Sequence, residues 1–188
     1  MIISKNDDRE VLPTDVIGRS VAHSKRWLVA IVRIHHEKKT SERLTKMGVE
    51  NFLPIQQEVH NWSDRRKVVD RVILPMMIFV HVDPQEQKEV LTLSAISRYM
   101  VLRGESTPAV IPDQQMLRFK FMLDYSDETI CMSTSPLAPG EKIRVLKGPL
   151  AGLEGELVDM NGKSKVAVRL TMLGCACVDI PAGCVEPV

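Results

Sequence analysis

The sequence has little of several features that mark common classes of protein. Aromatic residues make up only 4% of its 188 residues, and the formal net charge is only +1. A net charge this small gives no bulk attraction to nucleic acid, so any nucleic-acid site has to be a local patch. No apolar run approaches the roughly 18–20 residues that a helix needs to cross a bilayer. We therefore expect no membrane-spanning helix.

Cysteine is scarce, and its spacing predicts no metal or disulfide framework. None of the cysteines forms a CxxC pair, and no histidine is near them in the sequence. We expect small buried thiols in a reducing cytosol, with a metal site or a disulfide as the less favoured alternatives. The protein is accordingly expected to be cytoplasmic. The four cysteines are Cys131, Cys175, Cys177 and Cys184.

Catalytic and cofactor-binding motifs are missing as well. There is no phosphate-cradling GxxxxGK[ST] or GxGxxG run, and no serine has the context of a nucleophile elbow. His35 and His36 are adjacent, so on a helix they point in different directions and make a poor metal pair. We expect no enzymatic activity, no cofactor and no metal ion.

What the sequence does contain is typical of a globular protein with one or two domains. It is 44% hydrophobic and 26% charged, and its ten methionines indicate adaptable surfaces. Residues 1–24 begin with the polar, acidic run MIISKNDDREVLPTD, which does not fit a secretory signal. We expect this segment to be a flexible tail.

Apolar periodicity predicts the elements of residues 25–123. In chain order they are a strand at Trp27–Ile34, a helix at His35–Met47, strand-like runs at Phe52–His60 and Lys67–Val82, a helix from Asp83 to about Ser94, a strand at Tyr99–Arg103 and a helix at Ile111–Leu123. Pro75 predicts a kink before a central strand at Met76–Val82. Asp83 and Glu86 form a capping-box pattern. These elements predict an α+β fold with helices on a mostly antiparallel sheet.

The composition changes after the last of these helices. Asp124–Pro139 is short of large apolar residues and rich in Ser, Thr, Asp and Pro, which predicts a linker. From Gly140 onward the apolar period is two, and Asn161-Gly162 is a strong hairpin turn. Five short strands predict a small β-barrel at residues 140–188. We expect the barrel and the domain at 25–123 to be autonomous.

A glycine-rich connection inside this barrel is the most informative local motif. Gly148, Gly152 and Gly155 lie in the run LKGPLAGLEG, between alternating strands at Glu141–Lys147 and Gly155–Met160. Glycine allows a positive φ or a close backbone approach, so the run is a tight connection. Taken alone, it is only a loop between strands. With its flanks it resembles the KOW motif of transcription-elongation and ribosomal proteins.

The order of parts as a whole resembles the NusG family. A strand beginning with Trp27, a charged helix, a strand pair ending in LPMMIFVHV, a helix after IPD, a linker and a KOW barrel follow one another over residues 25–188. The resemblance implies an NGN domain, whose mostly antiparallel sheet is flanked by helices, and a C-terminal SH3-like five-stranded barrel. The NWSDRRK loop and the polar tail are more similar to the specialised UpxY and RfaH type of paralogue than to the housekeeping factor.

For function, the resemblance implies a transcription elongation or antitermination factor. Such a factor binds the clamp helices of the largest RNA polymerase subunit and suppresses pausing or termination, in specialised members at specific operons. The residues that match the family's docking pocket are Ile31, Leu74, Met77, Phe79 and Met100. Leu74 and Met77 replace aromatic residues, which implies a softer pocket. Strand alternation alone leaves open whether these side chains meet a partner or form plain core.

The first helix carries basic residues that the same resemblance relates to DNA. In RfaH-like members the positions of Arg33, Lys39 and Arg43 face the non-template strand of the transcription bubble, where a basic stripe can bind phosphates. The alternative is a solvated helix face that Glu37 and Glu42 neutralise.

The loop around Trp62, with Arg65 and Arg66, is a second candidate DNA contact. An exposed tryptophan with basic neighbours can stack on a base. The alternative is that Trp62 packs on its own strands.

The barrel implies a second protein partner. In the family this surface recruits a ribosomal protein or the termination factor Rho, and nothing in the sequence selects between them. A different class of function, an RNA-binding ribosome-associated KOW protein, is the alternative. Such proteins are usually strongly basic, so the net charge of +1 argues against it. We expect a monomer.

Overall fold

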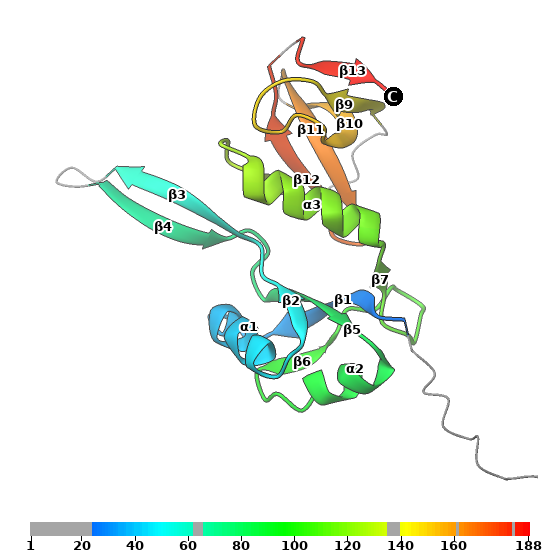
Figure 1. Cartoon of the computed structure of the whole chain (residues 1–188). Coiled ribbons are helices and arrows are strands. Elements are labelled where there is room, and N and C mark those ends of the chain that lie inside the picture. Colours follow the sequence, from blue (N-terminus) through cyan, green and yellow to red (C-terminus); the bar gives the residue numbers. More distant parts are fainter. Residues whose placement is uncertain (1–23, 62–65, 135–139, 161, 182) are drawn as a thin grey trace, which may run out of the picture.

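The structure, a computed structural model, describes residues 24–61, 66–134, 140–160, 162–181 and 183–188. The N-terminal elements are β1 (Arg26–Val32), α1 (Glu37–Lys46), β2 (Glu50–Phe52), β3 (Ile55–Asn61), β4 (Arg66–Val72), β5 (Met77–Val82), α2 (Pro84–Val90), β6 (Ile96–Tyr99), β7 (Val110–Ile111) and α3 (Asp113–Tyr125). The C-terminal elements are β8 (Cys131–Ser133), β9 (Glu141–Val145), β10 (Glu154–Met160), β11 (Lys163–Leu170), β12 (Gly174–Asp179) and β13 (Val185–Pro187). Figure 1 shows α3 between the sheets of the two parts. None of the described helices is long and apolar enough to span a membrane.

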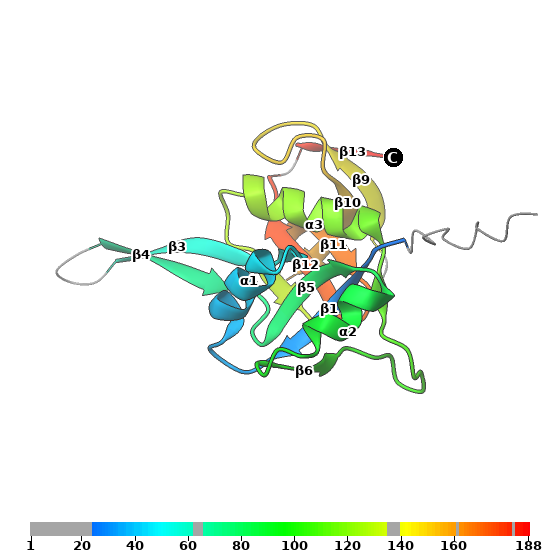
Figure 2. The ribbon, with the colours of Figure 1, turned by 60° about the horizontal axis from the view of Figure 1, so that its bottom comes forward.

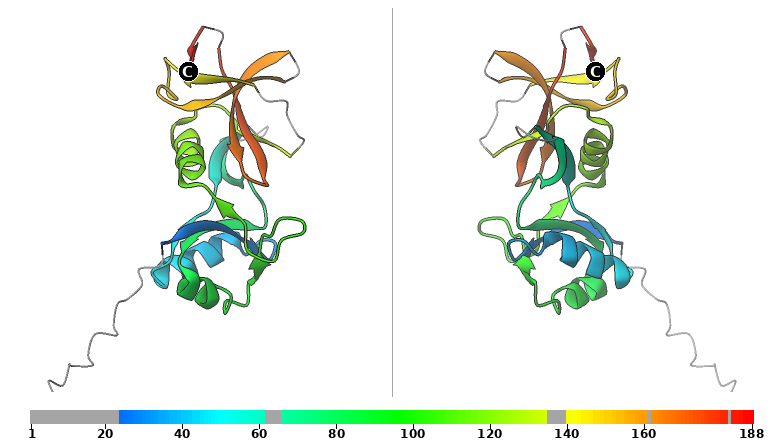
Figure 3. Two further views of the ribbon diagram at one scale, coloured as in Figure 1. Left: turned by 90° about the vertical axis from the view of Figure 1, so that its right-hand side faces the viewer. Right: turned by 90° about the vertical axis from the view of Figure 1, so that its left-hand side faces the viewer.

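The N-terminal sheet has the order β2-β5-β1-β6, with β7 also paired to β1, and all its pairings are antiparallel. Side chains alternate along β1, so Leu28, Ala30 and Val32 enter one core while Trp27 and Val29 enter another. The helices α1 and α2 cover the first face, and α3 lies on the second (Figure 3). The predicted α+β fold is therefore confirmed.

The run predicted at Lys67–Val82 forms two strands that belong to different sheets. β4 pairs with β3 in a two-stranded hairpin, in register from Ile55↔Val72 to Asn61↔Arg66, and this hairpin projects from the molecule (Figures 1 and 2). β5 belongs to the main sheet. The chain turns between them at Pro75 and Met76, where Met76 has a φ of 63°. The kink predicted at Pro75 is confirmed.

The start of α2 follows the predicted capping box. The Asp83 carboxylate accepts hydrogen bonds from the backbone N–H groups of Gln85 and Glu86, at 2.8 and 2.9 Å. The Glu86 carboxylate accepts one from the Asp83 N–H at 3.1 Å. These bonds satisfy backbone donors that have no partner inside the helix, so a short helix can begin sharply at Pro84.

The strand predicted at Tyr99–Arg103 lies earlier in the structure, as β6 at Ile96–Tyr99. In the rest of the predicted strand, residues 100–103, the only β-bridge is an isolated one between Val101 and Pro108. The same edge of β1 is shared by two partners, β6 and then β7. Pairing with β1 therefore decides where β6 lies, and the β-propensity of the local sequence does not predict this pairing.

The C-terminal sheet has the order β13-β9-β10-β11-β12-β8. The five predicted barrel strands correspond to β9–β13, and β8 adds a sixth from within the segment predicted as a linker. β8 pairs with β12 along three residues, and its Met132 packs against the main core. Its hydrogen-bonding partner is distant in sequence, so local composition gives no sign of it.

A continuous apolar core joins the two parts of the molecule through α3. The α3 residues Met116, Phe119 and Met122 are buried. They cluster with Val29 of β1 on one side and with Val168 of β11 on the other. The two parts share a core in this arrangement, and their autonomy stays a prediction.

Candidate functional site

The residues predicted to dock a partner gather on the α3 side of the N-terminal sheet. Ile31 of β1 is the direct Cα partner of Met77 of β5. The Met100 N–H donates to the Val29 carbonyl at 2.8 Å, which holds the next segment against β1. All five residues belong to one apolar cluster or pack against it. This set, here called the docking face, consists of Ile31, Leu74, Met77, Phe79 and Met100.

Exposure divides the docking face into a buried floor and an accessible rim. Phe79 is fully buried, and its ring centroid lies 6.2 Å from that of Phe52 and 5.9 Å from that of Phe119. Leu74 is only 7% exposed. The other three residues are half-buried. Only this rim can contact a partner without rearrangement of the core.

A hollow lies beside the rim, and residues of both the rim and the barrel line it. Its lining includes Ile31 and Met100 from the rim, Met172 from the turn between β11 and β12, and two exposed arginines, Arg98 and Arg103. Within the described residues, neither arginine side chain has an ion-pair partner. A hollow lined by both apolar side chains and exposed cations suits a partner that has apolar and acidic side chains.

The barrel turn at this hollow is held by α3. The backbone N–H and the hydroxyl of Thr171 both donate to Gln115 Oε1, at 2.8 and 3.0 Å. The next residue, Met172, has a φ of 69°, in the left-handed region that side chains other than glycine rarely adopt. The two hydrogen bonds to Gln115 therefore hold the turn that places Met172 beside the rim.

An ion pair also connects α3 to the barrel. Arg118 of α3 lies 2.5 Å from the Glu154 carboxylate, and Arg144 of β9 donates to the same carboxylate at 2.9 Å. The hydrogen bond from Arg144, and then that from Arg118, lower the pKa of Glu154 below its usual value. Both partners of the Arg118–Glu154 pair are half-buried at the surface, where an ion pair contributes little stability, so it orients the two parts more than it stabilises them.

A buried carboxylate that the sequence did not single out fixes the start of β5. Glu37, at the start of α1, is 7% exposed, and its Oε1 accepts a hydrogen bond from the Met76 N–H at 2.9 Å. The Met76 carbonyl in turn accepts from the Val32 N–H at 2.8 Å. Glu37 is therefore not part of a solvated face of α1, because its carboxylate is buried and hydrogen-bonded to the turn before β5.

The basic residues of the first helix region are accessible. Arg33 precedes α1, and Lys39 and Arg43 lie four residues apart on it; all three are exposed. Among the described residues none of them has an ion-pair partner. A fourth cation of this region, Lys38, does have one, because it bonds Asp70 of the hairpin at 2.7 Å. That bond lowers the pKa of the Asp70 carboxyl.

The second candidate for DNA contact falls mainly outside the described residues. Trp62 and Arg65 lie in the undescribed segment 62–65, and Arg66 is the first residue of β4. The ion pair between Lys38 and Asp70 links α1 with this hairpin. The exposed cations of α1 and the hairpin are thus neighbouring features of the fold.

The three glycines of the KOW loop serve two purposes. Gly148 and Gly152 have φ values of 89° and 91°, which a side chain would strain. A Cβ atom on Gly155 would lie 2.8 Å from the Ala167 carbonyl oxygen, so only glycine allows β10 to approach β11 there. The loop borders a small, largely apolar hollow of the barrel that includes Leu150.

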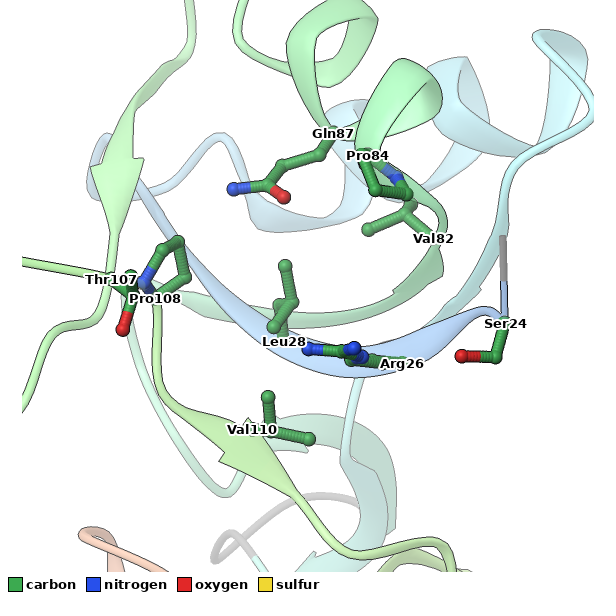
Figure 4. A pocket seen from close by; sticks show the side chains of 9 residues that line it. All are labelled: Ser24, Arg26, Leu28, Val82, Pro84, Gln87, Thr107, Pro108 and Val110. Atoms are coloured by element: carbon green, nitrogen blue, oxygen red, sulfur yellow. The ribbon is translucent and has the colours of Figure 1, made fainter. Parts of the chain in front are cut away.

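A further hollow lies over the start of β1, on the α2 side of the sheet. In Figure 4 the side chains of Leu28, from β1, and Gln87, from α2, point toward it. Among the described residues that line it, the exposed Arg26 is the only charged one, and there is no carboxylate, histidine or cysteine. Across the described part of the chain there is no group of side chains that could hold a metal ion.

Comparison with known proteins identifies the family. The family model described as NusG, transcription termination factor nusG, matches residues 25–120. Among solved structures, NusG of Thermotoga maritima superposes with a TM-score of 0.48 at 16% identity, covering 87% of this chain and 97% of that one. The two conformations of the MjSpt4:Spt5 complex give TM-scores of 0.29, at 10% and 12% identity, covering 86% of this chain and 97% and 96% of theirs. No curated protein matches the chain. The family model spans half of the sequence, and the chain therefore belongs to the NusG family of transcription factors.

Proposed function

We propose that this transcription elongation factor binds the clamp helices of the largest RNA polymerase subunit and suppresses pausing or termination. The observation that carries the proposal is the half-buried apolar rim at Ile31, Met77 and Met100. It is bordered by two exposed cations, Arg98 and Arg103, which have no ion-pair partner in the part of the chain that the structure describes. A helical tip with apolar anchors and acidic neighbours fits such a surface. The matched family segment, residues 25–120, contains the whole docking face.

The mechanism is binding alone, in the cytoplasm and with no catalytic step. A factor that binds the elongating state of the polymerase more tightly than the paused state shifts the equilibrium toward elongation by that difference in affinity. The NWSDRRK segment supports a specialised paralogue of the UpxY or RfaH type, which serves particular operons.

The exposed cations of α1 provide the DNA contact in this proposal. Arg33, Lys39 and Arg43 reach phosphates of the non-template strand once the rim is docked, and Trp62 with its basic neighbours adds a second contact from the hairpin. Their exposure and lack of ion-pair partners within the described residues support this role. Each phosphate contact makes binding more sensitive to salt.

The barrel is proposed to recruit a second protein, either a ribosomal protein or Rho. We divide the chain accordingly into a tail at 1–24, a docking domain at 25–123, a linker at 124–139 and a barrel at 140–188, acting as a monomer. The barrel turn at Met172 lies at the hollow beside the rim. Full engagement of the clamp helices therefore requires this turn to move away.

The proposal is tested with charge substitutions in the rim. Met77→Glu and Met100→Glu should each weaken binding to an isolated clamp-helix fragment by about 30-fold or more, the loss typical of an interface hot spot. Leu91→Glu is the matched control, because Leu91 is an exposed apolar residue at the end of α2, on the other side of the sheet. Circular dichroism and thermal unfolding establish that each variant is folded. A folded Met77→Glu protein with unchanged affinity rejects this docking site.

A further inference from the structure

Two of the cysteines face each other across the pairing of β8 with β12. Cys131 is the direct Cα partner of Cys177, while Cys175 is opposite Ser133. Residues directly opposite in an antiparallel pair have Cα atoms about 4.5–5.5 Å apart, within the roughly 4.4–6.8 Å range of disulfides. Diagonal neighbours are about 7–8 Å apart. The register therefore selects Cys177, and not Cys175, as the partner of Cys131.

The surroundings give the two thiols different roles. Cys131 is exposed and Cys177 is fully buried. Burial, with a smaller effect from Cys175, raises the pKa of Cys177 to about 11, so this thiol stays protonated near neutral pH. The Lys165 ammonium, which is hydrogen-bonded to Asp179, interacts electrostatically with both thiols. Of the two thiols, only Cys131 is open to a reagent in solvent.

We propose that Cys131 and Cys177 form a redox modification site that closes to a disulfide in the presence of a hydroperoxide. The Cys131 thiol releases its proton and attacks a peroxide oxygen, the O–O bond breaks, and Cys131 becomes a sulfenic acid. The hydroxide or alkoxide that leaves takes up that proton and becomes water or an alcohol. The Cys177 sulfur then attacks the Cys131 sulfur, and the hydroxyl group leaves as water with the Cys177 proton. The two thiols lose two electrons to the peroxide. A small thiol reverses the reaction by exchange.

The disulfide would fasten the segment that joins α3 to the barrel sheet. This segment already contacts the root of the hairpin, because the Ile130 N–H donates to Gln56 Oε1 at 2.9 Å and Gln56 Nε2 donates to the Glu128 carbonyl at 2.8 Å. Both Ile130 and Gln56 are buried. A covalent bond from β8 to β12 therefore ties the barrel edge to a segment held by the N-terminal part.

Oxidation then keeps the barrel in the arrangement described here, with Met172 beside the docking rim. For this step alone, the inference rests on the proposed function: oxidised protein should bind the clamp helices more weakly than reduced protein. The disulfide itself requires no polymerase and can be tested separately.

The chemical test treats the full chain with hydrogen peroxide, blocks free thiols and maps peptides by mass spectrometry. We expect a Cys131–Cys177 cross-link with the loss of two hydrogens, reversed by glutathione. Cys131→Ser and Cys177→Ala should each abolish it, whereas Cys184→Ser, which changes a half-buried thiol outside the pair, should leave its yield unchanged. A cross-link through Cys175, or oxidation of Cys131 to sulfonic acid without any cross-link, overturns the proposal.

The structural test measures amide hydrogen exchange in β8. Oxidation should slow exchange at Met132 by about tenfold or more, because opening of the strand is then restricted. An unchanged exchange rate in fully cross-linked protein overturns the fastening of this segment.

The functional test compares clamp-helix binding by oxidised protein, reduced protein and peroxide-treated Cys131→Ser. Weaker binding only by the oxidised native chain supports the regulatory step, and equal binding by all three overturns it. If no form binds while the cross-link forms and β8 is protected, the modification site stands and the proposed docking function fails.

Discussion

The two faces of the N-terminal sheet use the same strands but differ in how completely they are closed. On the face covered by α1 and α2, Ile78 and Val80 are fully buried. On the α3 face, Phe79 is equally buried, yet its neighbour Met77 is half-exposed. Adjacent residues of one strand thus serve a closed core on one side and an accessible rim on the other.

The side-chain types match this difference. The closed face is formed largely by β-branched residues of β1 and β5, whose side chains have few rotamers and pack in one way. The rim includes two methionines, Met77 and Met100, whose flexible thioethers can adapt to a partner. We conclude that one face specifies the fold, while the rim of the other leaves apolar area available for binding.

Substitution of Phe79 should give the largest loss of stability. Its side chain lies on the same face of the sheet as the rim, yet it is as fully buried as the residues of the closed face. Phe79→Ala should lower the free energy of unfolding by about 3–5 kcal/mol, the usual cost of deleting a buried aromatic ring. Urea denaturation followed by circular dichroism measures this. Phe79→Leu should cost clearly less because it leaves a smaller cavity. A loss below about 1 kcal/mol for the alanine variant would place Phe79 with the rim instead of the floor.

Ile78 and Met77 give the most direct comparison, since they are neighbours on β5 that point to opposite faces. Ile78→Ala should cost about 2–5 kcal/mol of unfolding free energy, because its cavity is closed on all sides. Met77→Ala should cost about 1 kcal/mol, near the typical value for point mutants. The same denaturation experiment measures both. Equal losses would mean that the two faces are equally closed.

Glu37 tests whether the turn before β5 depends on the buried carboxylate. Glu37→Ala leaves the Met76 N–H without its acceptor and should cost about 1–3 kcal/mol of unfolding free energy. Glu42→Ala is the control on the same helix, because Glu42 is exposed, and it should stay within about 0.5 kcal/mol. If both variants behave alike, the hydrogen bond from Met76 contributes nothing measurable.

Arg118 gives the smallest effect and concerns the barrel that borders the rim. The lowered pKa of Glu154 means that its charged form contributes stability above its ordinary pKa and loses it as the pH falls further. The largest contribution comes from Arg144, on the barrel strand β9, so only the contribution of Arg118, on α3, should depend on contact between α3 and the barrel. The measurement is the NMR chemical shift of the Thr171 amide during acidification. We expect Arg118→Ala to weaken the pH dependence of this shift. Arg103→Ala, which removes an arginine outside this ion pair, should not change it.

Features set by neighbouring residues could be predicted from the sequence. The capping box of Asp83 and Glu86 involves side chains and backbone groups within three residues, so the local sequence is enough to predict its hydrogen bonds. The kink at Pro75 follows from the missing N–H of proline. The glycines of the KOW loop likewise indicate a local backbone conformation, as the positive φ of Gly148 shows.

Features set by distant partners could not be predicted. The ladder of β8 exists only because the edge of β12 is free to pair with it. Glu37 looked like a surface charge of α1, because its acceptor role depends on a turn 39 residues away. For the docking face, the sequence grouped residues that share one apolar cluster, but the alternation of side chains along a strand does not separate the buried Phe79 from the half-exposed Met77.

The projecting hairpin has a consequence for how the molecule behaves at high concentration. Within the described residues β3 and β4 pair only with each other, so their outer edges offer unpaired backbone groups. The cross-strand neighbours Val59 and Val68 are 61% and 58% exposed. Charged side chains nearby, such as Lys67 and Asp70, oppose the addition of a further strand. Without those charges, the same hairpin would have the apolar, open-edged composition from which strand-by-strand aggregates grow.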